Sequence, residues 1–95
     1  MKVTFDQQYI TQTLADGLIV MLAWSQLEQV LIAWFAGKPH WLITSGSARM
    51  IVARDSEGER PLQDALAQLH NFDAALARQL LAKPSNEPRP VWRKN

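Results

Sequence analysis

The sequence contains no cysteine, only 20% charged residues and no long uninterrupted apolar run. The lack of cysteine excludes disulfides, thiolate catalysis and cysteine-based zinc sites, and it fits a reducing compartment such as the cytoplasm. The N-terminal segment lacks the apolar core of a signal peptide. The most apolar window, 18–36, is interrupted by polar residues, whereas a membrane-spanning helix needs about 20 mostly apolar ones. We therefore expect a cytoplasmic protein that does not span a membrane.

A chain of 95 residues, 47% of them apolar, is long enough for one globular domain. A domain of this size buries at most roughly 60–65% of its unfolded surface, so contacts with a partner could add to its stability. The net charge of +1 excludes a polyelectrolyte built for nucleic acid along its whole length. The charge is uneven, however. Residues 83–95 hold four Lys or Arg against one Glu, whereas residues 1–82 hold six against eight Asp or Glu.

The first part of the chain has the pattern of a β-hairpin. Apolar and polar residues alternate over 2–5, and the segment 9–14 begins with aromatic and β-branched residues, as strands do. Asp16-Gly17 then predicts a tight turn, because Gly tolerates the positive φ that such turns require. The returning strand, 18–24, is almost entirely apolar. It is therefore predicted to be central in its sheet or buried on both faces.

A short helix is predicted over residues 26–36. Ser25 and Glu28 have the spacing of a capping box, in which each side chain satisfies a free N–H of the first turn. The helix would present one apolar stripe at helical spacing. Gly37 is suited to the C-terminal cap, and Pro39 would prevent continuation. The stripe consists of Leu27, Val30, Leu31 and Trp34.

The second part of the chain predicts another hairpin and a longer helix. Segments 41–44 and 49–54 have strand character and are separated by a Ser-Gly-Ser turn. Pro61 suits the first turn of a helix, and apolar residues then keep helical spacing to about Ala82. Asn71 could break this helix in two, but the continuous spacing favours one helix with at most a kink. The stripe consists of Leu62, Ala65, Leu66, Leu69, Phe72, Leu76 and Leu80.

These elements predict an α+β fold in which a small, mainly antiparallel sheet of two hairpins packs against a short helix and a longer C-terminal helix. Pro84, Pro88 and Pro90 are predicted to end all regular structure. The chain would thus divide into a single α+β domain, 1–82, and a Pro-rich basic tail, 83–95. The apolar stripe of the long helix exceeds what so small a core needs, which makes a homodimer contact through this helix possible.

Over residues 3–66 the sequence resembles a small bacterial family of unknown function, the domain-of-unknown-function family 2442. That family shows a strand ending in an Asp-Gly turn, a second strand, an aromatic residue at the start of a helix, and a Trp-led strand followed by a glycine turn. The matching residues are Val3, Phe5, Asp6, Tyr9, Leu14 to Gly17, Val20, Leu22 to Trp24, Leu27, Trp41 to Ile43, Gly46, Met50 and Ile51.

The resemblance implies a compact α+β domain and no cofactor. Some members resemble one half of two-gene toxin–antitoxin pairs, which implies a protein-binding role. Many members also carry a Trp-Pro and an acidic cluster after the last strand. Here that place reads Ala53-Arg54-Asp55-Ser56-Glu57, which has only part of the acidic character and lacks the Trp-Pro.

Three groups of residues have the composition of a reactive or metal-binding site, but a structural role explains each of them better. His70 and Asp73 have the spacing of a helical metal pair, which is common by chance. Ser45 and Ser47 lie near His40, but neither serine has the glycine context of a nucleophile elbow. Asp55, Glu57 and Glu59 alternate in a loop, where acid–base work or cation binding would need a further ligand. We therefore predict no catalytic residue, no metal site and no cofactor.

The tail holds the predicted partner-binding residues. Trp92 lies between basic residues in a Pro-rich segment, where it could pack back on the domain or insert into a pocket of a partner. Trp24, Trp34 and Trp41, in contrast, are predicted to be core residues. The cations Arg89, Arg93 and Lys94 could contact phosphates, although so few charges give weak, salt-sensitive binding.

Three functions remain open from the sequence. The favoured one is a non-enzymatic protein-binding module that regulates or inhibits a partner, either antitoxin-like or encoded by a mobile element. The second is a nucleic-acid-binding accessory protein or transcriptional regulator that uses the basic tail. The third is a small enzyme with a pocket at His40 or at the 55–59 loop.

Overall fold

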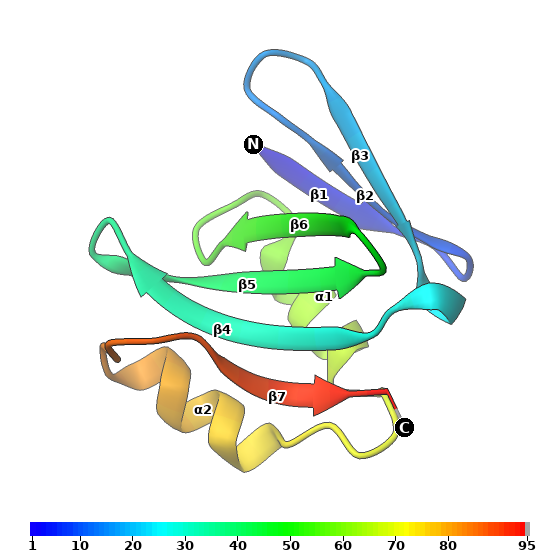
Figure 1. The fold of residues 1–95 in the computed structure, drawn as a ribbon. Helices are drawn as coiled ribbons and strands as arrows, with labels where there is room; N and C mark the ends of the chain where they lie inside the picture. Colours follow the sequence, from blue (N-terminus) through cyan, green and yellow to red (C-terminus); the bar gives the residue numbers. More distant parts are fainter. Residues whose placement is uncertain (95) are drawn as a thin grey trace.

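The computed structural model describes residues 1–94 and has the mixed α+β composition that the sequence predicts (Figure 1). It contains two antiparallel sheets instead of one. Sheet A has the order β1-β2-β3 and consists of β1 (Lys2–Phe5), β2 (Tyr9–Thr13) and β3 (Ile19–Ala23). Sheet B has the order β6-β5-β4-β7 and consists of β4 (Gln29–Phe35), β5 (Lys38–Ser45), β6 (Ala48–Ala53) and β7 (Arg89–Arg93). The helices are α1 (Glu59–Leu66) and α2 (Ala74–Ala82).

The predicted hairpin around Asp16-Gly17 is present as β2 and β3. Gly17 has φ +88°, and its N–H donates to the carbonyl of Leu14 at 2.9 Å, which closes the turn. The prediction that 18–24 is central or buried on both faces is wrong. β3 is an edge strand of sheet A, and Ile19 and Met21 lie largely exposed on the outer side of that sheet. The apolar run therefore has two uses: Val20 and Leu22 face the core, whereas Ile19 and Met21 form an apolar outer surface.

The predicted helix over 26–36 is wrong, because this segment forms β4, a central strand of sheet B. A short 3-10 turn, η1 (Trp24–Gln26), precedes it. β4 pairs with β5 on one side and with β7 on the other. A strand between two neighbours can be apolar on both faces, so its near-continuous apolar run satisfies helical and alternating spacing alike. The β-branched and aromatic residues favour the strand.

The signals that suggested helix ends have other roles in the structure. The Glu28 carboxylate accepts a hydrogen bond from the N–H of Gly46 instead of forming a capping box with Ser25. Ala36 and Gly37 have φ +53° and +78°, and these successive left-handed residues form the tight turn between β4 and β5. Pro39 lies within β5, opposite Trp34. Each residue typical of a helix boundary therefore serves a hairpin.

The second hairpin, β5 and β6, is confirmed, but the single helix predicted over 62–82 is wrong. α1 ends at Leu66 and α2 begins at Ala74, with Asn71 at φ +67° in the connection. The Asp73 carboxylate accepts from the N–H of Leu76 at 3.0 Å and thus caps α2. The N–H of Asp73 donates to the carbonyl of Val91 at 2.8 Å, which fixes the start of α2 to β7. The apolar residues of the predicted stripe pack in or against the core, apart from the half-buried Ala65.

The prediction that the prolines end all regular structure is wrong, because residues 89–93 form the edge strand β7. β7 pairs antiparallel with β4, and the register shifts between Val30 and Leu31. Pro90 is tolerated here because an edge strand leaves one side without a ladder partner. The 83–95 segment thus contributes a strand to sheet B, and Val91 belongs to the core.

Both helices lie on one face of sheet B, which we call the helix face. Trp41 of β5 contacts α1, and Trp34 of β4 contacts α2. Trp41 pairs with Ile32, which shares its side of β4 with Trp34. Sheet A stands at the β6 end of sheet B, and its Ile10 joins the same core (Figure 1). Within residues 1–94, neither α-helix has the length and apolar character needed to cross a membrane.

Candidate functional site

The three carboxylates of the 55–59 loop do not form a cluster. Asp55 pairs with Lys38 at 2.8 Å, and this hydrogen bond holds the pKa of Asp55 below its usual 3.8. Glu57 pairs with Lys2 at 3.7 Å on the surface. Glu59 points into the molecule and is buried. Because each acid has its own cation, the loop offers no shared site for a metal or for acid–base chemistry.

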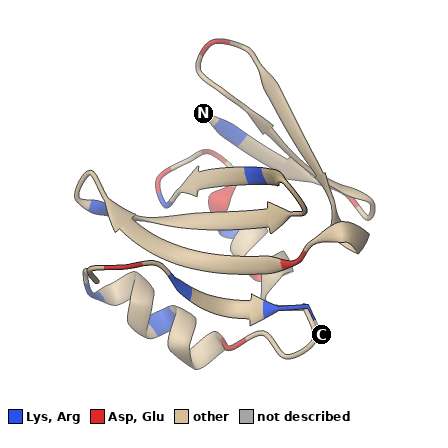
Figure 2. Ribbon diagram, viewed as in Figure 1, with Lys and Arg blue, Asp and Glu red and all other residues tan. Residues whose placement is uncertain are grey.

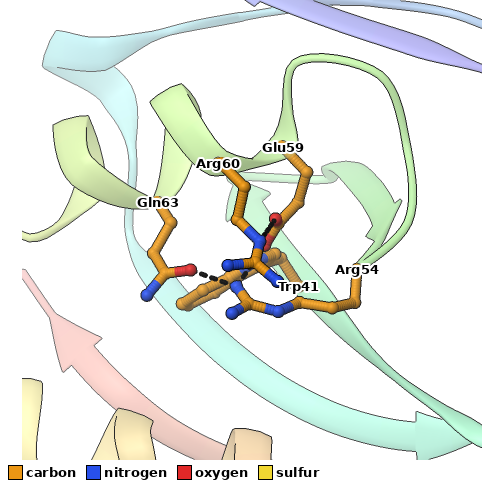
Figure 3. A network of polar contacts seen from close by, with 5 residues as sticks. All are labelled: Trp41, Arg54, Glu59, Arg60 and Gln63. Carbon is orange, nitrogen blue, oxygen red and sulfur yellow. Dashed lines mark hydrogen bonds and ion pairs between the residues drawn. The ribbon is translucent and has the colours of Figure 1, made fainter.

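Glu59 is the centre of a buried polar network (Figure 3). Its Oε2 accepts from Trp41 Nε1 at 2.6 Å and from Arg54 Nη1 at 2.9 Å. Arg54 also donates to the side-chain oxygen of Gln63. Arg60 Nε lies 3.3 Å from the second oxygen, Oε1, without hydrogen-bond geometry, so Oε1 accepts no hydrogen bond in the described part of the chain. Two arginines thus neutralise a carboxylate that ties α1 to the centre of sheet B.

Sequence reasoning missed this network. The sequence places Glu59 among three loop acids, whereas in the structure it follows Gly58 as the first residue of α1. The available signal was Trp41, because a buried indole N–H needs an acceptor. Which acceptor it finds depends on the packing of α1, and nothing local to Trp41 reveals that.

The histidines and serines do not combine into a catalytic group. His40 and Ser45 are five positions apart in β5, so their side chains project to opposite faces of sheet B. Ser45 Oγ donates to the carbonyl of Gln26 at 2.9 Å. Asp73 caps α2, and the side chain of His70 is exposed. Within residues 1–94, no group of three or more His, Cys, Asp or Glu side chains could hold a metal ion.

His40 is 6% exposed, and its ring stacks on Phe35 with centroids 3.6 Å apart. Its Nδ1 lies 3.0 Å from the carbonyl of Lys38. A carbonyl only accepts, so Nδ1 carries the proton and Nε2 keeps a lone pair in the neutral ring. Burial is the main cause that lowers the pKa of His40 below its ordinary value of 6.5. His40 is therefore neutral at neutral pH.

The predicted partner-binding residues lie in and just after β7. Trp92 packs against the core, and its Nε1 donates to the carbonyl of His70 at 2.8 Å. Arg89, Arg93 and Lys94 are exposed. The backbone N–H of Lys94 donates to the carbonyl of Glu28 at 2.9 Å, so the basic residues sit on an ordered edge of sheet B.

The face of sheet B opposite the helices, which we call the open face, brings Arg93 together with residues that the sequence did not single out. Arg93 pairs with Gln29, Gln29 with Thr44, and Thr44 with Arg49. Direct cross-strand partners share a side of the sheet, so these residues form one row with a cation at each edge. Figure 2 shows this basic character at the corresponding ends of β6 and β7.

The next row of the open face is apolar. Leu31, Leu42 and Ile51 are successive cross-strand partners. Ile51 remains 42% exposed, and Phe35, two rows further along β4, remains 46% exposed. Within residues 1–94, both helices pack on the other face and leave these residues uncovered. The open face therefore has an apolar centre and a basic end.

A groove of about 310 Å³ borders the open face beside β6. One wall comes from sheet A, with Leu14 and Val20, and the other from sheet B, with His40, Arg49 and Ile51. Within residues 1–94, the ion pairs use other cations than Arg49 and Arg93. Both guanidinium groups are thus available to an acidic ligand on this face.

Comparisons of the chain with protein-family models, with curated proteins and with solved structures gave no match.

Proposed function

We propose that the chain is a non-enzymatic binding module whose open face takes up an acidic, partly apolar segment of a partner protein and thereby regulates or inhibits that protein. One observation carries the proposal. Exposed Ile51 and Phe35 share this face with Arg49 and Arg93, neither of which has an acidic partner among residues 1–94.

The chemistry of the open face fits a protein ligand. Interfaces typically combine an apolar centre with arginine and aromatic side chains, and they are depleted in lysine and in acids. An acidic segment would be steered by the basic row and held by contact with Ile51 and Phe35. The regulatory and antitoxin-like part of the proposal rests on the family resemblance, which remains a prediction.

The absence of catalysis is part of the same proposal. The Glu59 carboxylate is enclosed by Trp41, Arg54 and Arg60. The groove presents one neutral histidine without an acid or nucleophile among its lining residues. General acid–base catalysis usually needs a second positioned group, so binding is the better interpretation of this surface.

Affinity capture from a lysate of the source organism tests the proposal with full-length variants. Deleting the tail is unsuitable, because it removes β7. We expect one stoichiometric protein on the unmodified chain and at least roughly tenfold weaker capture by the Arg49→Glu, Arg93→Glu double variant, since both cations would repel an acidic segment. Arg78→Glu is the matched control, because Arg78 is exposed on α2. A partner retained equally by all three proteins would refute the role of the open face.

A nucleic-acid-binding role is the second candidate, favoured by the exposed cations Arg89, Arg93 and Lys94 in and just after β7 and by the exposed Phe35 at the far end of the neighbouring strand β4. Aromatic stacking on an open sheet with flanking cations is a typical way to hold single strands. Fluorescence anisotropy with labelled single-stranded DNA and RNA tests it. Binding that weakens as salt rises and disappears when the three cations become Ala would support this role. Absent or salt-independent binding would reject it.

A further inference from the structure

Three of the four sheet edges in the described structure are occupied or protected. At β1, the N–H of Val3 donates to the carbonyl of Glu57 at 2.8 Å. At β6, the Gln12 side chain donates to the carbonyl of Ile51 at 2.6 Å. At β7, the carbonyl of Val91 accepts from Asp73, and the strand contains Pro90. Proteins commonly protect edges in these ways, because free backbone groups recruit further strands.

The β3 edge lacks such protection. Leu14 donates to the carbonyl of Leu18, and Trp24 donates to that of Gln8, so the even-numbered residues of β3 face β2. The backbone N–H and C=O groups of Ile19 and Met21 consequently point away from the sheet. Within residues 1–94, these groups form no hydrogen bonds.

The side chains along this edge are apolar and exposed. Leu18 is 62% exposed, Ile19 63% and Met21 53%. The segment 18–23 contains no charged residue and no proline. A free, uncharged, apolar edge strand is a predicted association site, so a partner strand that covers it is the expected solution.

We propose that a second copy of this chain covers the edge, with the two β3 strands antiparallel about a two-fold axis at Met21. Met21 then faces Met21 of the second copy, and these two residues exchange two backbone hydrogen bonds. Ile19 faces the small Ala23 of the second copy, and the reverse pair follows by symmetry. The two copies of sheet A become one continuous six-stranded sheet.

The sequence of β3 favours a second copy of this chain over a strand from another protein. A two-fold axis brings each side chain near its own copy, so a charge near the axis would be repelled by its copy, and β3 has none. The flexible methionine at the axis adapts to close contact with a second methionine. Large Ile19 opposite small Ala23 fills the same volume on both sides of the axis. This dimer is independent of the open face and therefore goes beyond the proposed function.

The mass of the purified full chain in solution tests the proposal, by light scattering or sedimentation equilibrium over a range of concentrations. We expect a species of twice the 10.8 kDa chain mass. Met21→Lys places two like charges at the axis and should raise the dimer dissociation constant about a hundredfold or more. The Met21 side chain is exposed, so this variant should stay folded, which circular dichroism verifies. Thr4→Lys is the control. Thr4 lies in the same cross-strand row as Met21, but on β1, two strands away from the β3 edge.

Crosslinking tests the register. The chain has no cysteine, so Met21→Cys introduces its sole thiol. Hydrogen-bonded antiparallel partners have Cα atoms about 5.5 Å apart, within the range of disulfides. Mild oxidation should convert this variant, but not Thr4→Cys, to a covalent dimer. A monomeric wild-type chain at all concentrations, which is the result expected if β3 binds a foreign strand, would overturn the proposal. So would a dimer that survives Met21→Lys, or equal crosslinking of both cysteine variants.

Discussion

His40 and Trp41 are neighbours in β5, yet they serve opposite faces of sheet B. On the helix face, the indole N–H groups of Trp34, Trp41 and Trp92 all donate to acceptors that the fold itself supplies. On the open face, His40 stacks on Phe35, but Ile51 and two arginines remain uncovered. The groups of the helix face are used within the fold, whereas the open face leaves apolar and charged groups exposed, which is what the proposed binding role requires.

The largest effect should come from breaking the helix face at Glu59. Glu59→Ala leaves the Trp41 N–H and the Arg54 guanidinium without their acceptor, and removing one partner of a buried ion pair costs about 3–5 kcal/mol. Urea denaturation measures the free energy of unfolding. The control is Glu57→Ala, two residues away, whose ion pair with Lys2 is largely exposed and should contribute less than about 1 kcal/mol. A similar loss for both variants would contradict the special role of the buried carboxylate.

Gly58→Ala should have the next largest effect, because this residue sets the approach of β1 to the start of α1. Gly58 has φ +86°, and an added Cβ would lie 2.0 Å from the carbonyl oxygen of Val3, so backbone must move. We expect a loss of about 2–4 kcal/mol from strain and displacement.

Gly17→Ala separates the effect of the positive φ from the effect of the close contact with Val3. Gly17 has a similar φ of +88° but open space around the added atom. Gly17→Ala should lower the free energy of unfolding by only about 1 kcal/mol, the cost of a left-handed residue alone. Equal losses at both glycines in thermal or urea unfolding would show that φ, and not the contact with Val3, decides the effect at Gly58.

The hairpins could be predicted from the sequence, because local signals determine them. The Asp16-Gly17 turn places β2 and β3, and the Ser-Gly-Ser turn places β5 and β6, because short hairpins are specified within a few residues. The prediction failed at β4 and β7, whose identity depends on pairing across the chain. The run from Leu27 to Phe35 satisfies helical and alternating patterns together, and only its neighbours β5 and β7 decide for the strand.

The candidate site was predictable only in part, for the same reason. Arg93 was named from its basic, Pro-rich surroundings, but its companion Arg49 lies 44 positions earlier and joins it through four paired strands. The tail residue Trp92 carries no local sign that His70 will accept its N–H. The composition of a segment can indicate that a residue is exposed. Which residues lie beside it in the sheet depends on the register of the strand pairs, and composition does not reveal that register.

The smallest of the predicted effects concerns His40, a buried titratable group of the open face. Its pKa lies below 6.5 in the folded protein, mainly because burial disfavours the charged ring, with Lys38 and Asp55 as the nearby charges. The unfolded chain therefore binds this proton first as pH falls. The free energy of unfolding should be constant above about pH 7, decrease as pH falls through 6.5, and level off below the folded pKa.

His40→Asn removes this titration while retaining a donor near the position of Nδ1. Urea denaturation between pH 8 and pH 5, on both proteins, should give a shallower pH dependence for the variant. All other titratable groups are the same in both proteins, so the difference between the two curves isolates His40. Parallel curves for the two proteins would show that His40 is equally easy to protonate in the folded and unfolded chains. The open face would then be more hydrated at His40 than its 6% exposure indicates, and the contrast with the dry helix face would weaken.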